Sequence, residues 1–156
     1  MRRRKAKKIA ILPDPKFNES VVTKFVNNLM HDGKKSLAFK IFYDAIDLVS
    51  ERTGEANGLD QWKTALTNVM PHVEVRSRRV GGATFQIPQQ IRPERKISVA
   101  MKWLIGYARG RNEKSMAGKL AGEIMAAAKE EGAAVKKRMD THKMAEANKA
   151  FSHFRF

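Results

Sequence analysis

The sequence predicts a mainly α-helical single domain of about six helices, with a protruding two-stranded β-hairpin and a basic N-terminal arm. Three observations predict this fold. Apolar residues recur at intervals of three and four along most of the chain, which is typical of amphipathic helices. The segment 72–91 instead alternates around a double glycine, and the first 19 residues are basic and interrupted by proline. Since the 156 residues contain no linker or repeat, we divide the chain into an arm, 1–19, and one domain, 20–156.

The arm is the most strongly charged part of the chain. Every residue from 2 to 8 except Ala6 is Lys or Arg, and Pro13-Asp14-Pro15 then prevents a helix. A basic run of this kind is often only a solvated tail. Because the rest of the chain is basic too, we expect the arm to contact phosphate groups.

Three helices follow the arm. We expect Ser20 to cap the first, which ends before Gly33. The second covers about 34–52, with Gly54 just after its end, and the third covers about 59–70. The residues expected to face the core in the first two helices are Val22, Phe25, Val26, Leu29, Ala38, Ile41, Phe42, Ala45, Ile46 and Val49.

The segment 72–91 has the composition of a β-hairpin, and its register has two alternatives. A two-residue turn at Gly81-Gly82 sets Arg78 opposite Phe85, which mixes charged and apolar side chains on one face. A three-residue loop, 80–82, aligns the valines of the first strand with Phe85 and Ile87 and leaves the arginines on a polar face. We prefer the three-residue loop.

Three more helices complete the domain. Pro93 begins the fourth, about 93–109, which has an apolar stripe and an opposite ridge formed by Arg95, Lys102 and Arg109. In the fifth, about 115–131, two glycines four residues apart either allow a close helix approach or weaken the helix by about 1 kcal/mol each. The sixth follows Gly132. The expected apolar positions are Ile97, Met101, Leu104, Ala108, Met116, Leu120, Ile124, Ala127, Val135, Met139 and Met144.

The net charge indicates the class of partner. Thirty-one Lys and Arg against sixteen Asp and Glu give +15, which is self-repelling unless a polyanion neutralises it. Nucleic acid is the usual polyanion, and an anionic membrane surface is the rival. No apolar run approaches the roughly 20 residues of a membrane span, and no secretion signal is visible. We therefore expect a cytoplasmic protein with a nucleic-acid partner and no membrane.

Catalytic chemistry is not indicated. The chain has no cysteine, and His31, His72, His142 and His153 are scattered without metal-ligand spacing. The run 33–36, GKKS, lacks the upstream glycine and strand of a phosphate-binding loop. We expect no enzyme, cofactor or metal.

Binding chemistry is indicated at three surfaces: the arm, the hairpin with the fourth-helix ridge, and the sixth helix. A hairpin limb of about eight residues projects roughly 25 Å, at ~3.3 Å per residue. Arginine presents a planar fork that suits phosphate and can stack on a base. Several basic surfaces on one small domain suit a folded RNA, which proteins recognise by shape and backbone.

Several motifs resemble the family of small-subunit ribosomal protein seven. The motifs are VEVRSRRVGGATFQIP at 73–88, PDPKF at 13–17, MHDGKKSLA at 30–38, KWLI at 102–105, Arg111 with Glu113 and Lys114, and THKMAEANKAFSHFRF at 141–156. They lie in the family's order along nearly the whole chain.

This resemblance implies a structural protein of the small ribosomal subunit that binds the 3′ major domain of 16S rRNA and nucleates assembly of the subunit head. It also implies contacts with small-subunit proteins nine and eleven. Exit-site tRNA and mRNA are expected near the hairpin tip, formed by Arg79, Val80, Gly81 and Gly82. The rRNA-binding residues that it implies are Arg2, Arg3, Arg4, Lys5, Lys7, Lys8, Lys34, Lys35, Arg76, Arg78, Arg79, Arg92, Arg95, Lys102, Arg109, Arg111, Lys114, Lys119, Lys136, Lys137, Arg138 and Lys143.

Two other functions are weighed against this one. An architectural DNA-binding protein with a β-arm is the main alternative, but such arms usually carry an apolar wedge at the tip. Here the tip is glycine and arginine, with Pro88 well down the limb. An RNA-modifying enzyme is opposed by the lack of a cofactor loop.

Overall fold

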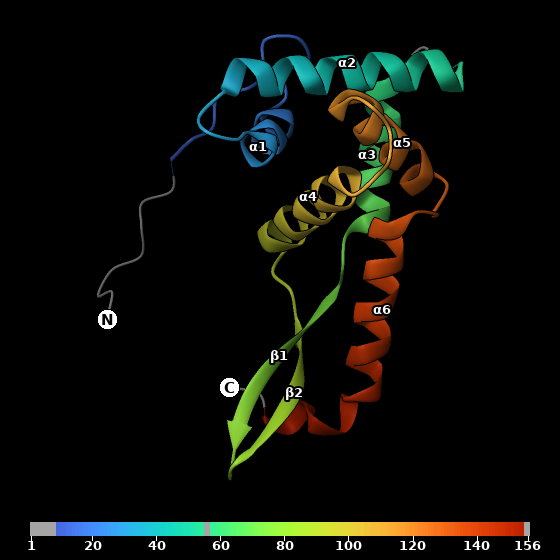
Figure 1. The fold of residues 1–156 in the computed structure, drawn as a ribbon. Helices are drawn as coiled ribbons and strands as arrows, with labels where there is room; N and C mark the ends of the chain where they lie inside the picture. Colours follow the sequence, from blue (N-terminus) through green and yellow to red (C-terminus); the bar gives the residue numbers. More distant parts are fainter. Residues whose placement is uncertain (1–8, 55–56, 155–156) are drawn as a thin grey trace.

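A helical body carries a long limb in the computed structural model, which describes residues 9–54 and 57–154. Figure 1 shows the body, residues 20–69 and 93–128, at one end and the limb, residues 73–90 and 133–154, at the other. The described residues form α1 (Ser20–Leu29), α2 (Lys35–Thr53), α3 (Gly58–Val69), β1 (Val73–Val80), β2 (Ala83–Gln90), α4 (Pro93–Arg109), α5 (Met116–Ala128), α6 (Ala133–Ala147) and a short 3-10 helix, η1 (Lys149–Phe154). The predicted fold class, mainly α with one hairpin, is confirmed.

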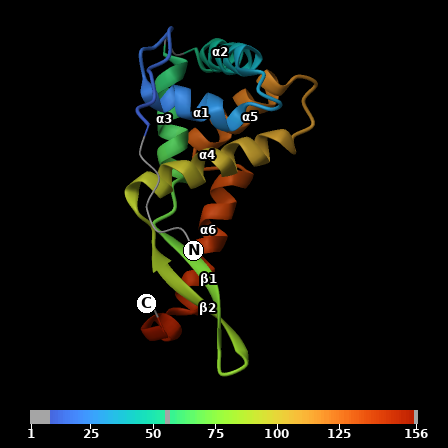
Figure 2. The same ribbon diagram turned by 90° about the vertical axis from the view of Figure 1, so that its left-hand side faces the viewer.

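The core lies in the body, where α1 to α5 pack around an aromatic centre. The rings of Phe25, Phe42 and Trp62 meet with centroids 5.3 to 5.4 Å apart, all fully buried. Aromatic side chains of this size supply much of the burial free energy of a core. Figure 2 shows α2 across the top of the body and α4 along its lower side, where the limb begins.

Local sequence signals explain three helix ends. Gly54 adopts φ 69° at the end of α2, as expected, and Pro93 begins α4. The predicted cap at Ser20 is wrong: Glu19 is the N-cap residue, and no side chain at that position caps the helix. Ser115 does cap α5, accepting a hydrogen bond from the Gly118 amide at 3.1 Å.

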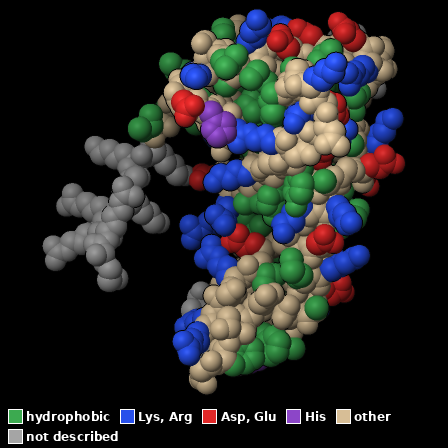
Figure 3. Space-filling model, viewed as in Figure 1, with side chains coloured by type: hydrophobic (Ala, Val, Ile, Leu, Met, Phe, Trp, Pro, Cys, Tyr) green, Lys and Arg blue, Asp and Glu red, His purple; other side chains and the backbone are tan. Residues whose placement is uncertain are grey.

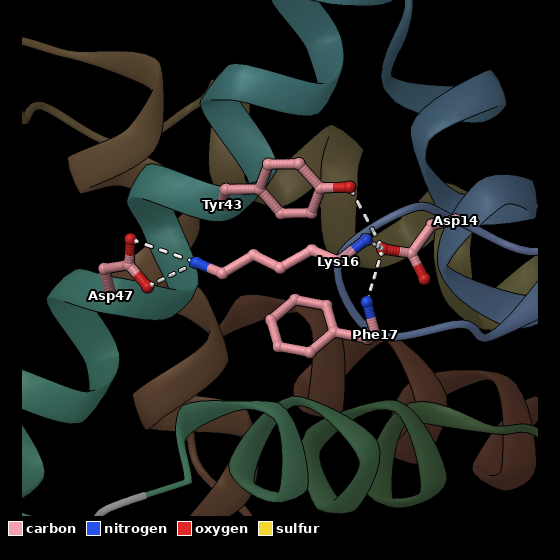
Figure 4. A network of polar contacts seen from close by, with 5 residues as sticks. All are labelled: Asp14, Lys16, Phe17, Tyr43 and Asp47. Carbon is pink, nitrogen blue, oxygen red and sulfur yellow. Dashed lines mark hydrogen bonds and ion pairs between the residues drawn. The ribbon is translucent and has the colours of Figure 1, made fainter.

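Asp14 fastens the chain before α1 to the body (Figure 4). Its buried carboxylate accepts hydrogen bonds from the backbone N–H groups of Lys16, Phe17 and Glu19 and from the Tyr43 hydroxyl, all at 3.0 to 3.1 Å. Burial alone raises the pKa of Asp14, but these hydrogen bonds outweigh it and hold the pKa below its ordinary value. Burial and the neighbouring carboxylate also raise the pKa of Tyr43 to about 12. Irregular backbone therefore becomes a fixed attachment.

The preferred hairpin register is wrong. The strands pair through a two-residue turn, with Val80 opposite Ala83 and Arg78 opposite Phe85. Both turn glycines have positive φ, 56° at Gly81 and 90° at Gly82, and such turns match the natural twist of a hairpin. Turn geometry therefore outweighs the separation of charged and apolar faces.

The limb contains more than the hairpin. Figure 1 shows α6 alongside β1 and β2, and η1 packs across β2. Phe85 meets Phe151 of η1 with ring centroids 5.0 Å apart. Of the residues expected to form the apolar face of α6, Val135 is buried as predicted. The prediction is wrong for Met139 and Met144, which are exposed. Because α6 leaves the body after its first turn, most of its length meets a thin hairpin through small residues such as Ala145.

Candidate nucleic-acid interface

The predicted cations lie on the body and on the limb. Figure 3 shows Lys and Arg side chains along one edge of the molecule, from the body to the end of the hairpin. The exposed ones are Lys34, Lys35, Arg76, Arg78, Arg79, Arg92, Arg95, Lys102, Arg109, Lys114, Lys136 and Lys143, and the half-buried ones are Arg111, Lys119, Lys137 and Arg138. Arg2, Arg3, Arg4, Lys5, Lys7 and Lys8 lie outside the described residues.

The richest convergence of predicted residues is a groove at the base of the hairpin, which we call the hairpin groove. It has a volume of about 640 Å³. Its lining residues come from β1, β2 and the start of α4: Glu74, Arg76, Gln89, Gln90, Ile91, Arg92 and Arg95. Guanidinium groups suit phosphate oxygens, and glutamine amides can bond the edges of bases. The groove therefore offers both kinds of RNA contact.

Glu74 links two of these arginines. Its Oε1 accepts hydrogen bonds from Nε of Arg76 at 3.0 Å, and its Oε2 accepts from Nε and Nη2 of Arg95 at 2.9 and 2.8 Å. Burial alone raises the pKa of Glu74, but the bonds from Arg95 and Arg76 hold it below its ordinary value. The carboxylate therefore stays ionised within a cationic groove.

The ridge on α4 is only partly available to a ligand. Arg95 is paired by Glu74 from the hairpin, and Nη2 of Arg109 donates to the Leu29 carbonyl at 3.1 Å. Lys102, between them, is exposed, and none of the described ion pairs includes it. Two of the three ridge residues thus also join elements of the body or limb.

A second groove, about 550 Å³, lies between the chain before α1, α1 itself and α4. Its polar lining includes Lys24, Asn27 and Asn28 on the outer face of α1, and its apolar lining includes Ile9 and Ile11. Lys24, Asn27 and Asn28 were not assigned to a site from the sequence. Their shared helical face was the available signal.

Arg111 has a structural role. Its Nε donates to Oε1 of Glu113 at 2.8 Å, and its Nη1 donates to Oε2 of Glu123 at 3.1 Å. Glu123, on α5, is 1% exposed and also accepts a hydrogen bond from the N–H of Ala134 at 3.0 Å. A Cβ at Gly122 would lie 2.7 Å from Oε1 of Glu113. The glycine thus permits the close approach of this loop, rather than of another helix.

The limb carries further cations and a histidine pair. Arg78 and Arg79 are exposed near the hairpin turn, and a basic cluster lies on α6. The rings of His72 and His142 stack with centroids 5.9 Å apart. The backbone N–H of His72 donates a hydrogen bond to Nε2 of His142 at 3.1 Å. Burial lowers the pKa of His142, and electrostatic repulsion from His72 and then from Arg138 lowers it further. This pair joins the hairpin base to α6.

Neither a metal site nor a membrane span is found in the described part of the chain. No group of three or more His, Cys, Asp or Glu side chains there is placed to hold a metal ion. None of its helices is both long and apolar enough to cross a membrane.

Comparison with known proteins gives one consistent result. The family model described as Ribosomal protein S7p/S5e matches residues 1–149. The small ribosomal subunit protein uS7 of Flavobacterium johnsoniae is 76% identical over 158 aligned residues, which cover 100% of both chains. The proteins of the same name from Christiangramia forsetii and Cytophaga hutchinsonii are 75% and 67% identical, again over 100% of both chains.

Proposed function

Because the chain belongs to the ribosomal protein S7p/S5e family, we propose that it is a structural protein of the small ribosomal subunit that binds 16S rRNA. Members of this family are not enzymes, and the chain takes part in translation as a component of a ribonucleoprotein. Its place is the small subunit in the bacterial cytoplasm. The net charge of +15 supports a polyanionic ligand of this kind.

The finer proposal concerns the place of this protein within the subunit. It binds the 3′ major domain of 16S rRNA directly and nucleates assembly of the head. Small-subunit proteins nine and eleven are its protein neighbours. The hairpin turn, with Arg79, Gly81 and Gly82, lies near exit-site tRNA and the mRNA path.

The observation that carries the proposal is the separation of the candidate RNA-binding surfaces. The hairpin groove includes Arg92 and Arg95, whereas the second groove includes Glu94, Ile97, Ser98 and Met101 of α4. The turn of the hairpin lies at the end of the limb that points away from the helical body (Figure 1). Salt-bridged and hydrogen-bonded side chains join the elements that carry them. A rigid protein of this form can hold several RNA helices that otherwise repel one another.

A salt titration tests the proposal. Binding is measured to a fragment of the 3′ major domain of 16S rRNA, to an unrelated structured RNA of equal length and to duplex DNA. We expect binding to the ribosomal fragment to survive salt that abolishes binding to the other two. If all three affinities fall together with one salt slope, specific rRNA binding is refuted. Tighter binding to the duplex would favour an architectural DNA-binding protein.

A further inference from the structure

Glu74 places a negative charge in a groove whose proposed ligand is negatively charged. Its side chain is only 16% exposed, whereas those of its partners Arg76 and Arg95 are 58% and 54% exposed. The acid is therefore the inner member of the cluster, and both cations extend past it into solvent. An RNA strand in the groove would meet the arginines first.

The bonding pattern fixes the orientation of both guanidinium groups. One carboxylate oxygen accepts from Nε of Arg76 and forms an ion pair with Nη2 of Arg76 at 2.9 Å, and the other accepts from Nε and Nη2 of Arg95. Each arginine thus uses the same edge of its planar group toward Glu74. The adjacent edge, formed by Nη1 and the second hydrogen of Nη2, faces a different direction and keeps two parallel donors. That edge matches the two oxygens of a phosphate.

The two arginines come from different elements. Arg76 lies on β1, two residues after Glu74, and Arg95 lies in the first turn of α4. Arginine side chains have large rotamer freedom, and ordering them on binding reduces affinity. A shared carboxylate removes much of that freedom before RNA arrives. It also fixes the spacing between a phosphate fork on the hairpin and one on the body.

We propose that Glu74 is a positioning residue for RNA binding. It holds the guanidinium groups of Arg76 and Arg95 in orientations that suit two phosphates of one RNA strand in the hairpin groove. The inference rests on the proposed function, because it takes RNA as the ligand of that groove. The acid raises affinity for an RNA whose phosphates fit the preset spacing. It does not do so for RNA in general.

The first test separates positioning from charge. Glu74→Gln removes one negative charge and one of the two acceptor oxygens that bind the arginines. Glu146→Gln removes the same charge from an exposed position on α6 of the same limb. Binding of both variants and the unmodified protein is measured to the 3′ major domain fragment and to an unrelated structured RNA. We expect Glu74→Gln to bind the ribosomal fragment about tenfold more weakly than Glu146→Gln. We expect the two variants to bind the unrelated RNA equally.

Several results would overturn the inference. If Glu74→Gln binds both RNAs as tightly as Glu146→Gln does, Glu74 does not position the arginines for RNA, and tighter binding would show that Glu74 repels RNA. An equal loss on both RNAs would show that the substitution damages the limb in general. If the unmodified protein shows no preference for the ribosomal fragment, the proposed function fails and the inference falls with it. A preserved preference with no selective loss in Glu74→Gln refutes the inference alone.

A double-mutant cycle with Arg95→Lys gives a second, independent test. Lysine keeps the charge but loses the fork. If Glu74 acts through Arg95, Arg95→Lys weakens specific binding in the unmodified protein severalfold and changes it little in the Glu74→Gln background. Additive losses would show that the two residues act separately, which contradicts a positioning role.

Discussion

Glu123 is the residue whose substitution should most clearly weaken the junction of body and limb. It is 1% exposed and accepts from Nη1 of Arg111 at 3.1 Å and from the N–H of Ala134, in the first turn of α6, at 3.0 Å. Glu123→Gln keeps the shape but has one acceptor oxygen, so its amide nitrogen must face one of these donors. A hydrogen bond to a charged group contributes about 1.5–3 kcal/mol. Since Arg111 is 34% exposed, water replaces part of its bond, and we expect a loss of about 2 kcal/mol.

Thermal unfolding measures this loss. For a chain of this size, 1 kcal/mol corresponds to a shift of about 2–4 °C, so Glu123→Gln should unfold about 4–8 °C below the unmodified protein. Glu131→Gln is the matched control, because Glu131 is exposed at the turn between α5 and α6. We expect that control to change stability by less than about 0.5 kcal/mol. Equal unfolding temperatures for the two variants would refute the assigned role of Glu123.

Three further predictions use the same structure. Gly122→Ala should lower the free energy of unfolding by about 1–3 kcal/mol, because the added Cβ would displace the Arg111 ion pair. Gly106→Ala should raise it by about 0.5–1 kcal/mol, because nothing lies within 4 Å of the added Cβ. Similar changes in unfolding free energy for the two variants would contradict this. Tyr43→Phe should be less stable than the unmodified protein by an amount that is constant between about pH 5 and about pH 10 and is lost at lower pH, where Asp14 becomes protonated. That difference should shrink as pH rises toward about 12, because the folded pKa is raised; a difference independent of pH would refute this. The double variant Arg78→Glu, Arg79→Glu should bind RNA more weakly, and the slope of log binding constant against log salt concentration should fall by about two. Loss of helical circular dichroism in this variant would contradict the separation of limb and core.

Features set by neighbouring residues were predictable from the sequence. Pro93 sets the start of α4, and the left-handed Gly54 ends α2, because each depends on backbone chemistry at one position. The location of the hairpin followed from its alternation and double glycine. Its register did not follow, because the separation of charged and apolar faces favours one register, whereas the geometry of a turn with two positive φ angles favours the other.

Features set by distant contacts were not predictable. Asp14 fastens the chain before α1 by accepting hydrogen bonds from three backbone N–H groups and from a tyrosine of α2. Met139 has the spacing of a core residue, but α6 has already left the body where it lies. The cationic residues were identified from charge and resemblance, whereas their convergence on a groove with Glu74 required the folded chain.

Directed hydroxyl-radical cleavage tests the central claim, that separate surfaces of one rigid protein contact one folded RNA. Since the chain has no cysteine, a single cysteine can carry an iron chelate at Ser77 on the hairpin, at Asn27 beside the second groove, or at Glu51 on α2 as a control. With the 3′ major domain fragment bound, we expect Ser77→Cys and Asn27→Cys to cleave two different RNA segments, each more strongly than Glu51→Cys cleaves any. Cleavage no stronger than the control from either position, or the same single segment from both, would contradict the claim.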